Sequence, residues 1–308
     1  METKEFNFYD TECLKSYNLD KAIRYQLNLL DTLDVFTRQH SENVASITCR
    51  LCQYLHFNKN FTLYCTTSAY LHDIGKLFVP ANILQKPDVL TDEEYEIMKK
   101  HTTNGYNLCK KDLKLRQYGA VALNHHESLN GSGYPNGLTL KDIPMEAQIV
   151  RVADQFDAIV SKRQYKTHID ISEALKLIIE DTKPINKHSP NIEENVGKLN
   201  KFIVKKLIKV VLDDIYLEIL YTQDYVEKLK NELDRFKQIE KYEEKMKKAK
   251  TEKDKNFYLN GMLLLLKKDE TLKTYKDRYT EFKEAYVMRK RMIDKLYDEI
   301  KIVKKLRV

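Results

Sequence analysis

The residues of this chain that could do chemistry gather around two short strings. The first is His-Asp-Ile-Gly-Lys at 72–76; the second is His-His-Glu at 125–127, followed by Gly-Ser-Gly-Tyr-Pro-Asn-Gly-Leu at 131–138. Seven side chains form the candidate site: His40, His72, Asp73, His101, His125, His126 and Asp154. Mixed imidazole and carboxylate ligands suit Fe, Mn or Zn in open sites, whereas a closed structural zinc normally has thiolates. The pattern therefore predicts an open metal site.

Asp73 is informative because it directly follows His72. The imidazole can bind one ion while the carboxylate, with its two oxygens, bridges to a second ion about 3.5 to 4 Å away. A water held between the ions would become a hydroxide at neutral pH, placed for in-line attack on phosphorus. Lys76 could neutralise phosphate charge or protonate the leaving oxygen. This favours phosphodiester hydrolysis with Asp73 and Lys76 as catalytic residues and no nucleophilic side chain.

The elements that must position these residues are predicted to be helices, because the apolar spacing is helical and strand-like alternation is hard to find. Thr91 and Glu94 have the form of a capping box at a helix start, and the stretch 78–90, with its two prolines, is expected to be a loop. The expected helices cover about 19–30, 34–55, 63–72, 91–101, 113–125, 145–160 and 172–180. The predicted fold class is all-α.

The character of the chain changes after residue 190, which predicts a catalytic domain over 1–190 and a separate helical region over 191–308. Beyond about residue 200 the chain has no proline, and apolar residues between Leu272 and Val303 follow a heptad-like spacing. A similar seam begins at Val226, and the charged segment 250–256 would be the turn of an antiparallel helical hairpin. A dimerising coiled coil is the alternative.

Composition excludes several classes of protein. The 308 residues contain no apolar run long enough for a membrane span and no basic and apolar leader, so we expect a cytoplasmic protein. The five cysteines are expected to be reduced core residues. The net charge of +7 arises after residue 170, on a part rich in both charges. We expect a solvated surface there and no nucleic acid as partner.

The order of the motifs resembles the HD-GYP domain, a branch of the HD phosphohydrolases, over roughly residues 20–185. The matching segments are His-Asp-Ile-Gly-Lys at 72–76, Met-Lys-Lys-His at 98–101, the His-His-Glu string with its Gly-Tyr-Pro loop, and Val-Ala-Asp at 152–154 with Phe-Asp-Ala at 156–158. The resemblance implies an HD-GYP helical bundle followed by the C-terminal long helices.

Members of that family hydrolyse the bacterial second messenger cyclic di-GMP to the linear dinucleotide pGpG, and often on to GMP, usually with iron or manganese. The resemblance implies a first ion on His40, His72, Asp73 and Asp154, and a second on Asp73, His101, His125 and His126. It assigns substrate binding to Lys76, Gly133, Tyr134, Pro135, Arg163 and Lys166. Some members hold a third ion through a Glu where this chain has Phe36, so two divalent ions are expected.

Three alternatives remain open at this stage. The substrate could be another cyclic dinucleotide, such as cyclic GMP-AMP, because the Gly-Tyr-Pro loop does not determine the second base. The chain could be a catalytically weak HD-GYP scaffold that signals through its C-terminal helices. Those helices could bring together a homodimer or bind a protein partner.

Overall fold

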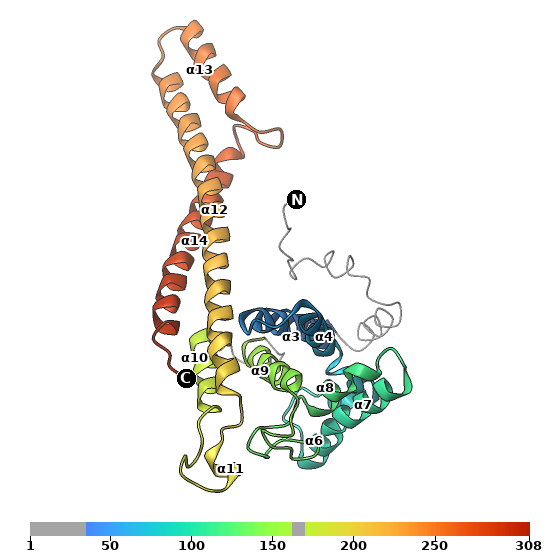
Figure 1. The fold of residues 1–308 in the computed structure, drawn as a ribbon. Coiled ribbons are helices and arrows are strands. Elements are labelled where there is room, and N and C mark those ends of the chain that lie inside the picture. The colour runs from blue at the N-terminus through green and yellow to red at the C-terminus, as the bar shows by residue number, and fades with distance from the viewer. Residues whose placement is uncertain (1–34, 162–169) are drawn as a thin grey trace. The chain divides into compact units, whose positions relative to one another are not determined.

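The computed structural model describes residues 35–161 and 170–308, which are rich in α-helix and contain no β-strand (Figure 1). The predicted all-α class is confirmed, while the helix expected over 19–30 lies outside the described residues. The chain divides into two compact units, Met1–Val211 with Lys305–Val308, and Leu212–Lys304. The functional boundary at residue 190 stays a prediction.

Most helices of the first unit are short and surround the candidate site. In chain order they are α3 (Val35–Tyr54), α4 (Lys59–Leu71), the 3₁₀ helix η1 (Ile74–Phe78), α5 (Ala81–Leu84), α6 (Asp92–Lys99), α7 (His101–Lys111), the 3₁₀ helix η2 (Arg116–Tyr118), α8 (Gly119–Asn124), α9 (Met145–Val160), α10 (Ile171–Glu180) and α11 (Ile192–Asn195). Helix α3 packs against α4 and α9, and α7 packs against η1 and α8. The segments that carry the candidate residues are thereby brought together.

Local capping determines where several of these helices begin. Thr91 caps α6 as predicted, and its hydroxyl and the Glu94 carboxylate form the reciprocal capping box. The side chain of Asn58 accepts a hydrogen bond from the amide of Phe61 and starts α4 earlier than expected. The helix predicted over 113–125 is shorter, because Asp112 accepts the amide of Lys114 in a local turn and regular α-helix begins only at α8.

Gly75 lies where η1 packs against α7. Helix α4 already ends at Leu71, so Gly75 does not stop it and lies instead in η1. A Cβ atom there would overlap the backbone carbonyl of His101 and approach the backbone nitrogen of Gly105 at 2.5 Å. Only glycine lets η1 pack this closely against α7, so Gly75 determines how near His101 comes to the His72–Asp73 junction.

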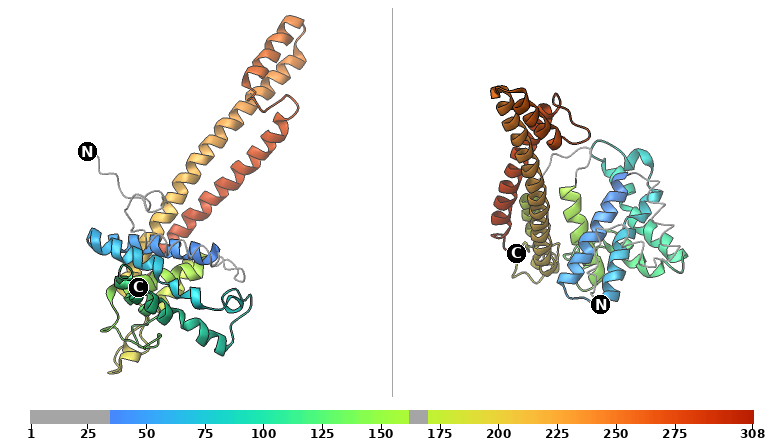
Figure 2. Two further views of the ribbon diagram at one scale, coloured as in Figure 1. Left: turned by 90° about the vertical axis from the view of Figure 1, so that its right-hand side faces the viewer. Right: turned by 90° about the horizontal axis from the view of Figure 1, so that it is seen from above.

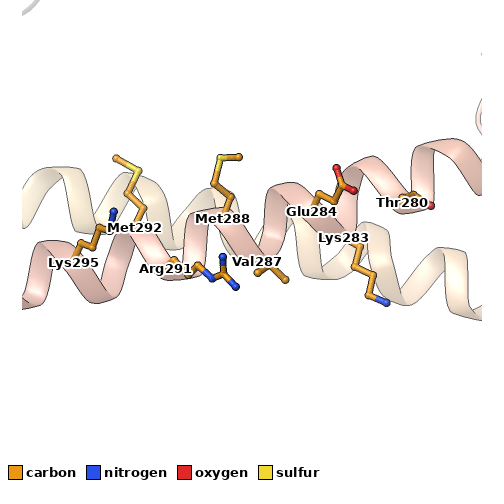
Figure 3. A pocket seen from close by; sticks show the side chains of 8 residues that line it. All are labelled: Thr280, Lys283, Glu284, Val287, Met288, Arg291, Met292 and Lys295. Atoms are coloured by element: carbon orange, nitrogen blue, oxygen red, sulfur yellow. The ribbon is translucent and has the colours of Figure 1, made fainter.

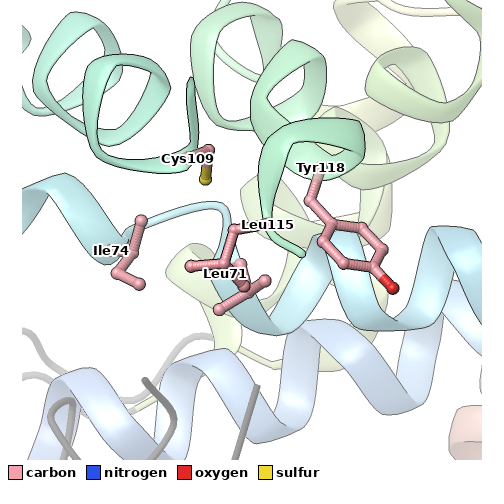
Figure 4. Close-up of a cluster of buried hydrophobic side chains, with 5 residues drawn as sticks. All are labelled: Leu71, Ile74, Cys109, Leu115 and Tyr118. Carbon is pink, nitrogen blue, oxygen red and sulfur yellow. The ribbon is translucent and has the colours of Figure 1, made fainter. Parts of the chain in front are cut away.

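A buried apolar cluster supports the backbone around that junction (Figure 4). Leu71 and Ile74, the residues on either side of His72 and Asp73, are both fully buried in it. The other buried members are Cys109, Leu115 and Tyr118. The two polar residues are therefore anchored from both sides by side chains that are costly to expose to water.

The second unit contains three helices in sequence: the later part of α12 (Lys201–Lys248), then α13 (Glu252–Leu265) and α14 (Tyr275–Val303). Phe236 packs on Tyr279 and Gln223 donates a hydrogen bond to Tyr297, so α14 runs antiparallel to α12. Figures 1 and 2 show the two helices side by side. The expected antiparallel helical hairpin is present.

The predicted turn at 250–256 is confirmed only in its first residues: the chain reverses direction at 249–251, and Tyr258 of α13 packs back on Tyr242 of α12. Thr251 accepts a hydrogen bond from the amide of Asp254 and starts α13 at Glu252, inside the charged segment. The longer connection, 266–274, is closed by Glu270, whose two carboxylate oxygens accept from Arg235 at 2.6 and 2.8 Å. Most of the charged segment therefore lies in the first turn of a helix that Thr251 caps.

Two further features bear on the location of function. A groove on α14 is lined by exposed Val287 and Met288 together with lysine, arginine, glutamate, threonine and methionine side chains (Figure 3). Its lining includes no histidine or cysteine, so the chemistry predicted from the sequence must be sought in the first unit. No helix among residues 35–161 and 170–308 has the length and apolar character needed to span a membrane.

Candidate metal centre and substrate loop

Five segments of the first unit bring the predicted ligands together. His40 lies on α3, His72 and Asp73 follow α4, His101 begins α7, His125 and His126 follow α8, and Asp154 lies on α9. The ligand atoms form two groups, His40 with His72 and Asp73, and Asp73 with His101, His125 and His126, each within 4.8 Å of one another. Asp73 belongs to both groups.

The two oxygens of the Asp73 carboxylate face different groups. Oδ2 lies 3.3 Å from His72 Nε2 and 3.7 Å from His40 Nε2. Oδ1 lies 3.4 Å from His101 Nε2 and 3.8 Å from His125 Nε2. This arrangement suits a carboxylate that bridges two cations.

Hydrogen bonds outside the cluster orient the histidine rings. The Nδ1 atoms of His72, His101 and His125 lie 2.6, 2.7 and 3.0 Å from the backbone carbonyls of residues 69, 98 and 122. Because a carbonyl oxygen can only accept, each Nδ1 carries the hydrogen and each Nε2 directs its lone pair at Asp73. The predicted ligand atoms are thus presented in the tautomer that binds metal.

Two observations on the histidine nitrogens indicate that the cluster fits a metal site. Nε2 of His72 is buried and has no hydrogen-bond partner among the described residues. Nε2 of His101 lies 3.2 Å from Nε2 of His125, although the hydrogens of both rings are on Nδ1. Two lone pairs this close repel each other unless a cation lies between or beside them, so the cluster is suited to divalent ions.

Burial and charge set the protonation of these groups. Burial lowers the pKa of His101 and lowers that of His125 well below its ordinary value, which keeps both rings neutral. Burial alone would raise the pKa of Asp73, but the positive charge of Lys76 is the largest opposing influence, and that pKa is held well below its usual range. The second group therefore offers neutral imidazoles around an ionised carboxylate, the states that bind metal.

Asp154 lies beside the first group, next to His40. Nε2 of His40 is 3.1 Å from Asp154 Oδ1, which is itself 3.9 Å from His72 Nε2. Nδ1 of His40 lies 2.7 Å from Asp157, a buried carboxylate that also accepts from Asn43 and Ser161. Burial disfavours the charged imidazole, but hydrogen bonds to both aspartates raise the pKa of His40 to about 9. Asp157 is a positioning residue to which the sequence assigned no role.

Within residues 35–161 and 170–308, two cationic side chains lie at the cluster. Lys76 Nζ is 2.5 Å from Asp73 Oδ2. Arg151, which the sequence reasoning missed, lies with Nη1 3.0 Å from His126 Nδ1 and 4.0 Å from Asp154 Oδ2. The only sequence signal for Arg151 is its spacing, because it lies three residues before Asp154 and so on the same face of α9.

The loop after His126 is clamped by the neighbouring Glu127. Its buried carboxylate accepts the backbone amides of Asn136 at 2.7 Å and Leu138 at 2.9 Å. Gly133 lies so close to this residue that a Cβ atom would stand 2.5 Å from Glu127 Cα. The close contact explains the glycine of the Gly-Tyr-Pro segment and brings the Tyr134 ring, stacked at 4.8 Å, onto His126.

The structure therefore brings together all seven predicted ligands, Lys76 and the Gly-Tyr-Pro loop with Pro135, although their individual roles stay predictions. Arg163 and Lys166 lie outside the described residues. Five segments of the chain together form one cluster of histidine and aspartate. This combination of helical fold and cluster is typical of the HD phosphohydrolases.

The comparisons agree with that class. The chain belongs to the HD domain family, whose model matches residues 24–185. The resemblance to the HD-GYP branch is confirmed by this match together with the relatives below.

A cyclic di-GMP phosphodiesterase of Thermotoga maritima is 42% identical over 180 residues, which are 58% of this chain and 48% of the relative. The 3′3′-cGAMP-specific phosphodiesterase 1 of Vibrio cholerae is 33% identical over 49% of this chain and 35% of its own length. Among solved structures, Bd1817, an HD-GYP-type protein of Bdellovibrio bacteriovorus, is 22% identical over 66% of each chain, with a TM-score of 0.45. The chain spans about half or less of the length of these curated relatives.

Proposed function

We propose that the chain is a metal-dependent phosphodiesterase that hydrolyses cyclic di-GMP to pGpG, GMP or both. One observation carries the proposal: the Asp73 carboxylate presents one oxygen to His72 and the other to His101. A carboxylate between two sets of imidazoles is the arrangement needed to hold a pair of divalent ions, which we propose to be iron or manganese. The names of relatives such as the Thermotoga maritima enzyme support the choice of substrate.

The bound ions would supply Lewis-acid polarisation of the phosphodiester and activation of a water. The chain contributes the rest. Lys76, held 2.5 Å from Asp73 and 15% exposed, neutralises charge on the scissile phosphate or protonates the leaving oxygen. Tyr134 receives a base of the substrate, Gly133 and Pro135 shape its loop, and Arg163 and Lys166 bind phosphate.

The function is tested with protein purified without oxygen, loaded with Mn or Fe(II) and incubated with cyclic di-GMP, with the products separated by chromatography. We expect pGpG, GMP or both from the wild type, and both loss of product and lower bound metal from Asp73→Ala. Elemental analysis of the same samples determines which metal binds and how many ions. Absence of turnover by fully metal-loaded protein would contradict the proposal.

Cyclic GMP-AMP is a second candidate substrate, favoured by the name of the Vibrio cholerae relative. Parallel assays with both dinucleotides distinguish the two. The scaffold alternative predicts that cellular function survives in Asp73→Ala. A cytoplasmic location, a homodimer or protein partner through the C-terminal helices, and the domain boundary at 190 stay predictions of the sequence.

A further inference from the structure

An aromatic surface extends from the metal cluster to α6. Tyr134 is stacked on His126, with ring centroids 4.8 Å apart and an interplanar angle of 25°. Tyr95, on α6, meets Tyr134 edge to face at a centroid distance of 6.4 Å and 78°. Because Tyr95 is 47% exposed, part of its ring is open to a ligand.

A cation lies over the same surface. Lys99, one turn after Tyr95 on α6, places its ammonium 5.4 Å from the Tyr95 ring centroid and 5.7 Å from that of Tyr134. Its ion-pair partner, Glu96, is 66% exposed, and exposed ion pairs contribute little stability. The ammonium can therefore exchange this carboxylate for a hydrogen-bond acceptor on a ligand.

The ligand that fits two tyrosine rings and an ammonium is a flat base carrying acceptor atoms. Bases stack on aromatic side chains with a substantial gain in affinity. Guanine presents two adjacent acceptors, O6 and N7, where adenine presents a donor beside N7. Lysine can only donate, so an ammonium at this place favours guanine.

A tyrosine followed four residues later by a lysine also occurs without a site. On α7, Lys110 lies 5.9 Å from the ring centroid of Tyr106, the same local arrangement. The pair on α6 differs because both members meet Tyr134, a residue from a different segment, and Tyr134 in turn contacts a residue of the metal cluster. The convergence of α6 and the loop on one side of the cluster marks a binding surface.

We propose that Tyr95 and Lys99 form, with Tyr134, the purine-binding part of the substrate site, and that Lys99 selects guanine over adenine. This inference rests on the proposed function, since it places a base of the cyclic dinucleotide one ring beyond His126. It adds two specificity-determining residues on α6 to those that the sequence predicted.

The test uses the full chain and the variants Tyr95→Ala, Tyr95→Phe and Lys99→Ala. Lys110→Ala and Tyr221→Ala serve as matched controls, because Lys110 belongs to the equivalent pair on α7 and Tyr221 is an exposed tyrosine on α12. Equilibrium dialysis measures binding of cyclic di-GMP and cyclic di-AMP to protein freed of metal by chelation. Steady-state kinetics of metal-loaded protein compare cyclic di-GMP with bis(p-nitrophenyl) phosphate, which has no base.

We expect Tyr95→Ala to weaken binding of both dinucleotides about tenfold and Tyr95→Phe to retain most of the affinity. Lys99→Ala should weaken cyclic di-GMP binding about five- to tenfold and cyclic di-AMP binding less than about twofold. In Tyr95→Ala the ratio of kcat/KM for cyclic di-GMP to that for bis(p-nitrophenyl) phosphate should fall about tenfold, while the control variants keep the wild-type values.

The outcomes separate this inference from the proposed function. If metal-loaded protein does not hydrolyse cyclic di-GMP but metal-free protein binds it through Tyr95 and Lys99, the function fails and the binding surface stands. If hydrolysis occurs and the Tyr95 and Lys99 variants behave like the controls, the binding surface is overturned. Absence of both binding and turnover overturns both.

Discussion

His40 and Asp157 are 117 positions apart in the sequence, yet His40 Nδ1 lies 2.7 Å from Asp157 Oδ2. The contact joins α3 to α9 and turns Nε2 of His40 toward Asp73 and Asp154. Residues that orient a ligand in this way commonly change metal affinity by about 10- to 100-fold when they are replaced.

The first prediction follows from this contact. Asp157→Asn should lower affinity for the ion at the first group by about 10- to 100-fold, because the ring of His40 loses its charged acceptor. Isothermal titration calorimetry, with Mn²⁺ added to metal-free protein, measures the affinity. Asp298→Asn, on α14, removes a carboxylate that is 70% exposed and should not change it. Equal affinities in both variants would show that Asp157 does not orient His40.

The second prediction concerns the clamp on the loop. In Glu127→Gln one of the two backbone amides now held by the buried carboxylate loses its acceptor. A hydrogen bond to a charged group contributes about 1.5 to 3 kcal/mol, so the free energy of unfolding should fall by about that amount. The KM for cyclic di-GMP should rise as well, because Tyr134 is no longer held on His126. Glu180→Gln, which alters an exposed carboxylate, is the control.

Urea unfolding measures the stability part of this prediction, and initial rates measure the KM. A variant that keeps both wild-type values would show that the Gly-Tyr-Pro loop keeps its conformation without the clamp.

The third prediction concerns Gly75. Gly75→Ala should lower the free energy of unfolding by more than the amount typical of overpacking, which is about 1 to 3 kcal/mol. The reason is that the added carbon meets the backbone of His101 and not a movable side chain. Bound metal should fall too, since His101 must move. Gly261→Ala in α13 is the control, as its added carbon would lie 3.4 Å from the Tyr242 ring and alanine favours helix. Thermal unfolding and elemental analysis give the two readouts. Similar melting temperatures for the two variants would refute the predicted close packing.

The fourth prediction is a pH dependence in the second unit. Hydrogen bonds from Arg235 outweigh the effect of burial and lower the pKa of Glu270 from its ordinary 4.5 to about 2. A depressed carboxyl pKa contributes stability that is complete above the unfolded-state value and is lost as the pH falls toward the folded-state value. The stability difference between wild type and Glu270→Gln should therefore be largest at neutral pH and shrink between pH 4.5 and about 2.

Circular-dichroism melts of both proteins across this range check the prediction. Glu252→Gln, whose carboxylate is 80% exposed, should show little difference from wild type at any pH. A Glu270→Gln difference that stays constant with pH would contradict the assigned pKa.

The fold class and the residue types of the site can be predicted from the sequence. The 3.6-residue apolar period indicated helices, Thr91 with Glu94 started one of them correctly, and the histidine and aspartate strings named every member of the cluster. These features are local, because a period, a cap or an adjacent pair of ligands can be recognised within a few residues. The turn predicted at 250–256 extends too far along the chain for a related reason: a charged run has the same composition in a loop and in the first turn of a helix.

Which atoms face one another depends on the folded structure. Three sets of contacts join segments that are distant in the chain or that turn back on themselves. The two Asp73 oxygens face different histidines, and Glu127 holds the amide of Asn136. Arg151 approaches His126, and Tyr95 approaches Tyr134. The physical reason is that a side chain's partner depends on how helices pack, and packing depends on the whole buried core. The sequence therefore named the ligands, and the fold determined how they are oriented.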